Sequence, residues 1–216
     1  MTRAQRARQP QHDEARQQLR AYRDKRDPAR SGEPRGGRRR PRRQPRFVVQ
    51  QHQARSLHYD FRLEAEGVLK SWAVPKGPPA DPADKRLATM TEDHPLDYED
   101  FEGAIPAGEY GAGQVIVWDA GRYENQTTDS GGHPVDLPEA IGRGHVSVFL
   151  HGKKLRGGYA LTRLRRRGRE DWLLVKKSDE FAGGDPVAAR PESVKSGKSI
   201  EEIASGKSGG QRGKRS

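Results

Sequence analysis

Short apolar runs alternate with polar turns along most of the chain. Eight such runs are rich in β-branched and aromatic residues, and Gly, Pro or Asp punctuates most of the gaps between them. The pattern predicts strands at residues 47–52, 58–64, 68–74, 86–91, 114–124, 145–150, 158–164 and 171–177. A single brief helical pattern, at residues 137–141, interrupts them. The expected fold is therefore mainly β, a barrel or sandwich of about eight strands with short peripheral helices.

The two ends of the chain follow different patterns. Residues 13–26 could form a polar helix, but its apolar stripe of Leu19 and Tyr22 is too thin to predict firm docking. Residues 31–46 are dense in Gly, Pro and Arg, which is typical of an extended, mobile linker. Near the other end, a capping-box spacing predicts a short helix at residues 199–204, followed by a disordered tail.

The charge is concentrated at these ends. The formal net charge is +11, and residues 1–46 alone hold 16 basic and 5 acidic side chains. Basic arms on a slightly acidic body favour a polyanionic partner, because Lys and Arg neutralise phosphates. Solvated tails that only aid solubility would give the same composition, so the charge alone leaves both interpretations open.

Several classes of protein are excluded. The chain has no cysteine, so it has no disulfide scaffold and no Cys-ligated zinc or iron–sulfur site. No apolar run approaches the ~20 residues of a membrane span, and the basic amino terminus lacks the apolar region of a secretory signal. We expect a cytoplasmic protein without a membrane partner.

The densest chemical signal lies in residues 51–64. His58, Asp60 and Arg62 alternate along a predicted strand and so share one face. With His52 from the preceding strand, they offer two nitrogens and one oxygen, a set that suits Mn²⁺, Fe²⁺ or Zn²⁺. The spacing fits an ordinary surface pair of His and carboxylate equally well.

A second cluster follows in residues 74–103. Lys76 and Arg86 provide donors suited to an ionised phosphate, whereas the neighbouring Lys85 is expected to be solvated. His94 stands between Asp93 and Pro95, away from any apolar run, so we expect it to be accessible and able to donate a hydrogen bond or a proton near neutrality. Tyr98 completes this set of candidate phosphate-binding residues.

Two long segments point to a family. The stretch FVVQQHQARSLHYDFRLEAEGVLKSWAVPKGP, followed by DPADKRLATMTEDHPLDYEDFEGAIPAGEYGAGQVIVWDAG, closely resembles the 3'-phosphoesterase domain of bacterial DNA ligase D. The resemblance extends upstream through Tyr22, Lys25, Arg26, Asp27, Glu33 and Pro34, and downstream to about Ala204. Pro28 is a departure, since an aromatic residue is expected there. The chain carries no KxDG ligase motif and resembles a stand-alone form.

The resemblance implies a compact β-barrel and a Mn²⁺-dependent enzyme, although other divalent transition metals would also suit the site. Such an enzyme removes a 3'-terminal ribonucleotide and then the remaining 3'-phosphate. The implied metal ligands are His52, His58 and Asp60. The implied neighbours of the scissile phosphate are Arg62, Lys76, Arg86, His94 and Tyr98, with His94 as transition-state stabiliser or general acid. The implied substrate-binding residues are Arg26, Asp27 and Glu33.

The same resemblance sets the expected organisation and partners. We expect a basic arm at 1–21, a family segment with an Arg-rich linker at 22–46, a barrel at 47–186 and a C-terminal extension at 187–216. The partners would be DNA or DNA/RNA primer-template 3' ends, with a separate ligase and polymerase, and the protein would be a monomer.

Two alternatives stay open on the sequence alone. Two His and one Asp on a β-barrel could serve a non-haem Fe(II) oxygenase, although surrounding cations favour a phosphoryl substrate. A non-catalytic module that only binds DNA ends would carry the same motifs.

Overall fold

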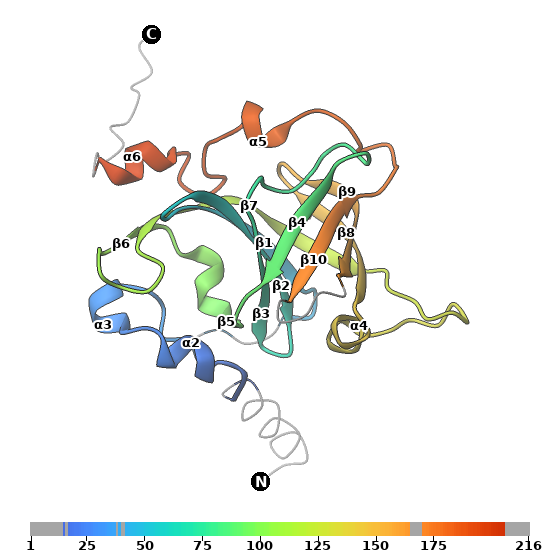
Figure 1. The fold of residues 1–216 in the computed structure, drawn as a ribbon, viewed down its shortest axis with the longest axis horizontal. Coiled ribbons are helices and arrows are strands. Elements are labelled where there is room, and N and C mark those ends of the chain that lie inside the picture. Colours follow the sequence, from blue (N-terminus) through green and yellow to red (C-terminus); the bar gives the residue numbers. More distant parts are fainter. Residues whose placement is uncertain (1–14, 16, 38, 40–41, 165–169, 206–216) are drawn as a thin grey trace.

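A closed antiparallel β-barrel forms the body of the molecule (Figure 1). The computed structural model describes residues 15, 17–37, 39, 42–164 and 170–205. Eight strands close the barrel in the order β1-β2-β3-β4-β10-β9-β8-β7, because β1 pairs with both β2 and β7. Their bounds are β1 Arg46–Gln53, β2 Leu57–Ala65, β3 Val68–Val74, β4 Lys85–Met90, β7 Gly113–Asn125, β8 His145–Gly152, β9 Arg156–Arg163 and β10 Asp171–Lys176. The prediction of a mainly β fold with eight strands is confirmed.

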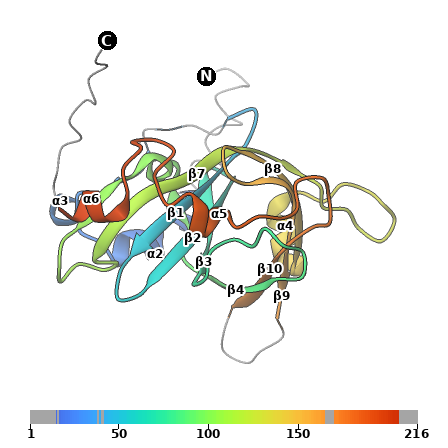
Figure 2. The ribbon, with the colours of Figure 1, turned by 90° about the horizontal axis from the view of Figure 1, so that it is seen from above.

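Short elements surround the barrel (Figures 1 and 2). Strand β5, His94–Pro95, pairs with β3, and β6, Gly103–Ile105, pairs with β7. The helices are α2 Arg20–Asp24, α3 Pro28–Ser31, the 3-10 helix η1 Leu96–Asp100, α4 Leu137–Arg143, α5 Pro186–Ala189 and α6 Ile200–Ala204. None of the helices described has the length and apolar character of a membrane span.

Alternation along the strands builds the barrel interior. In β2, Tyr59, Phe61 and Leu63 face inward and are buried. Trp72 of β3 and Trp172 of β10, on either side of β4, meet edge to face in the interior, with ring centroids 5.8 Å apart. The polar residues of β2 therefore lie on the outer face, as the period of two requires.

A second apolar cluster covers the outer face of β1 and β3. Leu19 and Tyr22 from the N-terminal segment pack there with residues of η1, and Tyr22 is fully buried. The Tyr22 hydroxyl donates to the Pro34 carbonyl at 2.9 Å. The expectation that this helix would not dock is wrong, because the barrel and η1 supply the apolar surface that the helix itself lacks.

The described part of the Arg-rich linker is also held in place. The Glu64 carboxylate accepts hydrogen bonds from the backbone N–H groups of Arg42 at 3.0 Å and Arg46 at 3.1 Å. The Pro45 carbonyl accepts from Tyr123 N at 3.1 Å. Residues 42–46 therefore form a fixed loop and not the mobile linker that their composition predicts.

The remaining elements agree with the sequence in type. Asp136 caps α4, and Ser199 and Glu202 form the predicted capping box at α6. Strands β5 and β6 and helices α3, η1 and α5 were not predicted, because elements of two to five residues leave no periodic pattern. The extreme arms and the tip at residues 165–169 lie outside the described residues.

Docking of the N-terminal segment predicts that two substitutions of Tyr22 lower the stability of the protein by different amounts. Tyr22→Ala should lower the free energy of unfolding by about 3 kcal/mol, because it empties a fully buried aromatic site. Tyr22→Phe keeps the ring and loses only the hydrogen bond to Pro34, so it should cost about 1 kcal/mol. Urea denaturation of both variants would measure this, and equal stability of wild type and Tyr22→Ala would show that the segment does not dock.

Candidate metal centre

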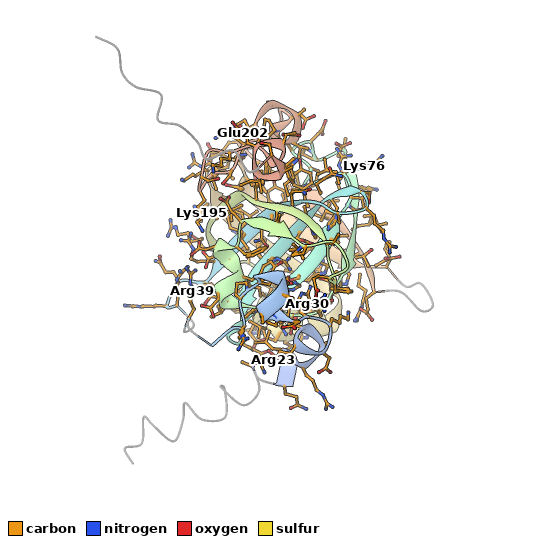
Figure 3. All side chains as sticks on the ribbon, turned by 90° about the vertical axis from the view of Figure 1, so that its left-hand side faces the viewer. Arg23, Arg30, Arg39, Lys76, Lys195 and Glu202 are labelled. Carbon is orange, nitrogen blue, oxygen red and sulfur yellow. The ribbon has the colours of Figure 1, made fainter. Side chains whose placement is uncertain are left out.

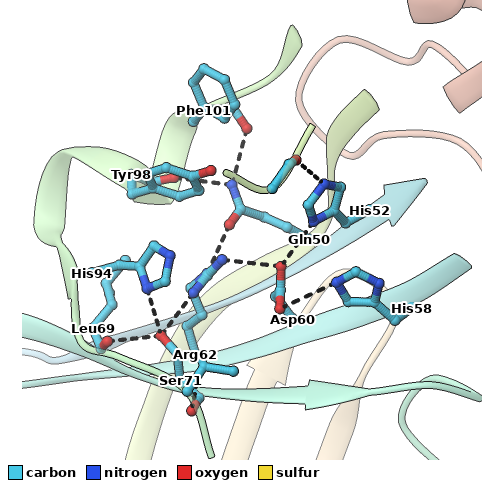
Figure 4. A network of polar contacts seen from close by, with 12 residues as sticks. Gln50, His52, His58, Asp60, Arg62, Leu69, Ser71, His94, Tyr98 and Phe101 are labelled. Atoms are coloured by element: carbon cyan, nitrogen blue, oxygen red, sulfur yellow. Dashed lines mark hydrogen bonds and ion pairs between the residues drawn. The ribbon is translucent and has the colours of Figure 1, made fainter. Parts of the chain in front are cut away.

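The β1–β2 hairpin brings the three predicted metal ligands together (Figure 4). His52 lies directly opposite His58, and Asp60 lies one same-face step further along β2. His52 Nδ1 is 3.7 Å from Asp60 Oδ2, and His58 Nε2 is 3.8 Å from Asp60 Oδ1. One ligand atom from each residue fits within 4.8 Å of the others. Two nitrogens and one oxygen thus converge on a single point.

Backbone carbonyls select the tautomer of each imidazole. His52 Nε2 lies 2.9 Å from the Gly111 carbonyl, and His58 Nδ1 lies 3.1 Å from the Ser56 carbonyl. A carbonyl only accepts, so each of these nitrogens carries the proton. The other nitrogen of each ring then presents a lone pair toward Asp60. Three acceptors face one another without a proton between them, which is the arrangement that a bound cation would satisfy.

A buried guanidinium keeps the carboxylate ionised. Arg62 Nη2 donates to Asp60 Oδ2 at 3.1 Å, and both side chains are almost inaccessible to solvent. Burial alone would raise the pKa of Asp60, but the Arg62 charge holds that pKa well below its usual range. Asp60 is therefore available as an anionic ligand at any pH near neutrality.

Two residues that the sequence did not single out position Arg62. Gln50 Oε1 accepts from Arg62 Nε at 2.9 Å, and Ser71 Oγ accepts from Arg62 Nη1 at 2.8 Å. Gln50 is itself fixed, because its amide donates to the carbonyls of Tyr98 and Phe101, each at 3.0 Å (Figure 4). Gln50 is two residues before His52 in β1, so the period of two could have placed it on this face.

His94 is buried, which contradicts the expectation that it is accessible. Only 4% of it is exposed, because Tyr22 and Tyr98 pack edge-on against its ring. Its Nδ1 donates to the Glu92 carbonyl at 2.9 Å, so Nε2 is left to accept from Arg26 Nη2 at 3.3 Å. Burial, together with the charges of Arg62 and Arg26, lowers the pKa of His94 well below its ordinary value.

The predicted substrate-binding residues separate into two groups. Arg26 and Glu33 are buried beside the centre: Glu33 Oε1 accepts from Arg26 Nε at 3.0 Å and from the Tyr98 hydroxyl at 2.9 Å. Arg26 also pairs with Glu92 at 2.7 Å, a partner that the sequence did not indicate. Asp27 instead caps α3, accepting from the backbone N–H of Ala29.

The two remaining predicted cations stand at the same end of the barrel as the triad. His52 ends β1, His58 begins β2, Lys76 follows β3 and Arg86 begins β4, and these strands are antiparallel neighbours. Lys76 is exposed, and it makes no ion pair within the described part of the chain (Figure 3). Arg86 pairs with Asp84 at 2.6 Å. Neither contacts the triad directly.

The fold and the site define a class: a β-barrel with a two-His, one-Asp centre, flanked by buried cations. The family model of the DNA ligase D 3'-phosphoesterase domain matches residues 50–163, which include the whole triad. The chain belongs to this family, as its resemblance suggested.

Relatives from bacterial repair proteins agree with this membership. The chain is 49% identical over 192 residues to the multifunctional non-homologous end joining protein LigD of Pseudomonas aeruginosa, covering 84% of this chain and 22% of that protein. It is 53% identical over 117 residues to the multifunctional non-homologous end joining DNA repair protein LigD of Mycobacterium tuberculosis, covering 54% and 14%. The chain thus spans less than a quarter of the length of these relatives. Membership in a 3'-phosphoesterase family suggests that the chain is a hydrolase.

The buried His94 predicts a pH dependence of stability. The unfolded chain binds a proton at this histidine near pH 6.5, whereas the folded chain resists it, so the contribution of His94 is complete above about pH 6.5 and is lost as the pH falls. The free energy of unfolding should therefore fall less steeply in His94→Gln than in wild type between about pH 7 and about pH 5. Urea titrations at several pH values would measure both slopes. His133→Gln, at a side chain that is 81% exposed, controls for losing one imidazole, and identical slopes in all three proteins would contradict the prediction.

Proposed function

We propose that this protein heals the 3' ends of DNA by phosphoester hydrolysis. It removes a 3'-terminal ribonucleotide as a phosphodiesterase and a 3'-phosphate as a phosphomonoesterase, leaving a 3'-hydroxyl for synthesis and ligation. The observation that carries the proposal is the convergence of three proton-free acceptors beside a buried cation network, in a chain of the 3'-phosphoesterase family.

His52, His58 and Asp60 would hold a divalent ion, and we propose Mn²⁺. The donor set fits, because it combines two imidazole nitrogens of fixed tautomer with a carboxylate that stays ionised. A bound ion supplies Lewis-acid polarisation of a phosphate oxygen. Arg62 keeps Asp60 oriented toward that position, and its own donors are engaged with Gln50 and Ser71.

Of the remaining residues, the two cations act on the charge of the substrate, and the two buried rings support the site. Lys76 and Arg86, at the same end of the barrel as the triad, neutralise phosphate oxygens. We assign His94 a positioning role in stabilising the transition state: its lowered pKa disfavours the imidazolium that a general acid requires, and its Nε2 accepts from Arg26 and so holds that guanidinium in place. Burial and Glu33 raise the pKa of Tyr98 well above its ordinary value, so Tyr98 keeps the hydroxyl proton that it donates to Glu33.

The substrates and partners follow from this chemistry. The protein acts on the 3' ends of DNA or of DNA/RNA primer-templates, and a separate polymerase and ligase complete the repair. The names of its relatives, which describe multifunctional end-joining proteins, support this setting.

Metal removal gives the direct test. A primer-template with a 3'-phosphate and one with a single 3'-ribonucleotide should both be converted to 3'-hydroxyl ends with Mn²⁺ and stay unchanged with a chelator, as followed on denaturing gels. Binding without conversion under every condition would identify a non-catalytic end-binding module. Turnover of 2-oxoglutarate would identify the oxygenase.

Substitution of one ligand tests the proposed centre. Asp60→Asn keeps the shape of the side chain but removes the charge, and His58→Ala removes a nitrogen. Each should reduce the rate at least about 100-fold, since even outer-shell partners of metal sites are worth about 10–100-fold. Calorimetric titration with Mn²⁺ should show weakened binding in both. His145→Ala, at an exposed site on β8, is the matched control, and full activity of His58→Ala would refute the site.

A further inference from the structure

A row of basic side chains crosses three strands at the far end of β1. Arg46 of β1 lies opposite Arg122 of β7, which lies opposite His151 of β8. Directly paired residues of antiparallel strands share a face, so these three side chains lie on one side of the sheet. Arg46 also shares its face of β1 with His52, an even number of residues away. The row is therefore about 20 Å from the triad along β1, at ~3.3 Å per residue.

A wide open groove follows this row. Its volume is about 790 Å³, and its basic lining comes from the 42–46 loop and the ends of β7 and β8. The basic residues that line it are Arg42, Arg43, Arg46, Arg122, His151 and Lys153. None of the residues that line it belongs to the triad or contacts it in the described part of the chain. The groove is thus a place distinct from the metal centre.

The wall of the groove is fixed within the fold. Glu64 holds the backbone N–H groups at both ends of the 42–46 loop, and Tyr123 N holds the Pro45 carbonyl between them. These contacts use the backbone, so they do not depend on which side chains the loop carries at these positions. A ligand would meet a preformed wall and would incur little cost in ordering it.

The charges in the groove are only partly compensated. Glu99 pairs with Arg42 at 3.0 Å and Arg46 at 2.6 Å, and Glu124 lies 2.8 Å from His151. Arg43 and Arg122 have no acidic partner within the ranges that the structure describes. The groove therefore keeps an excess of positively charged side chains, carried by a backbone that is held in place. This suits an anionic ligand.

We propose that this groove binds the sugar-phosphate backbone of duplex DNA, upstream of the 3' end that occupies the metal centre. The inference rests on the proposed function and adds a second contact region to it. Three adjacent strands, ~4.8 Å apart, spread the row over about 10 Å, wider than a single phosphate. Duplex DNA rises 3.4 Å per base pair, so a separation of about 20 Å corresponds to about six base pairs from the terminus.

Neutral phosphate linkages test the contact at a defined position. An 18-base-pair primer-template with a 3'-phosphate would carry methylphosphonates on both strands at positions 5–8 from the 3' end. Wild type should bind it several-fold more weakly than the unmodified duplex, as measured by fluorescence anisotropy. Arg43→Gln/Arg122→Gln should bind the unmodified duplex several-fold more weakly, lose nothing further with the methylphosphonates, and show a salt slope smaller by about 2.

Two controls separate this contact from general charge effects. Arg20→Gln/Arg143→Gln removes the same charge from exposed helical sites and should keep the wild-type response to the methylphosphonates. Methylphosphonates at positions 13–16, beyond the groove, should change no affinity. The proposal would be overturned if Arg43→Gln/Arg122→Gln lost further affinity with the methylphosphonates, so that the two losses added up. An unchanged salt slope of DNA binding in this variant would also overturn it. Release of 3'-phosphate by wild type, assayed in parallel, reports on the proposed function separately, since it can fail or succeed whatever the binding data show.

Discussion

The buried ion pair between Asp60 and Arg62 constrains the rest of the site. Neither side chain is exposed enough to be solvated, so each depends on the other, and removing one would leave an uncompensated charge in the interior. The guanidinium has further donors, and Gln50 on β1 and Ser71 on β3 accept from them. One cation thus ties three neighbouring strands together. The position of the Asp60 carboxylate between the two imidazoles therefore depends on the same hydrogen bonds that connect these strands.

The N-terminal segment protects this network from water. Arg26 lies between the rings of Tyr22 and Tyr110, at 4.3 and 4.8 Å from their centroids, and its charge is balanced by Glu33 and Glu92. Arg30 of the same segment pairs with Glu109 at 2.9 Å. The loop that carries Glu109 and Tyr110 also carries Gly111, whose carbonyl fixes the tautomer of His52. The N-terminal segment is far from the triad in sequence, yet it contacts the loop whose carbonyl holds the ligand His52.

The strands and the face that carries the metal ligands could be predicted because they depend on residues that are close together in the sequence. A period of two decides which side chains of β1 and β2 share a face, and this rule alone places His58, Asp60 and Arg62 together. The burial of His94 could not be predicted in this way. It depends on Tyr22, which is far away in the sequence, and on the docking of a helix whose thin apolar stripe does not predict that docking. Glu64 and Glu92 likewise look like ordinary acids in the sequence, since their partners become apparent only from the tertiary contacts.

Glu64 fixes the path of the 42–46 loop through backbone contacts that do not depend on the side chains of the loop. A carboxylate that binds side chains demands particular residues, but this one binds two backbone N–H groups, which every residue except proline possesses. Most substitutions in the loop would leave its path unchanged and alter only what it presents to solvent. The loop is therefore a place where evolution, or a protein engineer, can vary surface charge without rebuilding the barrel beneath it.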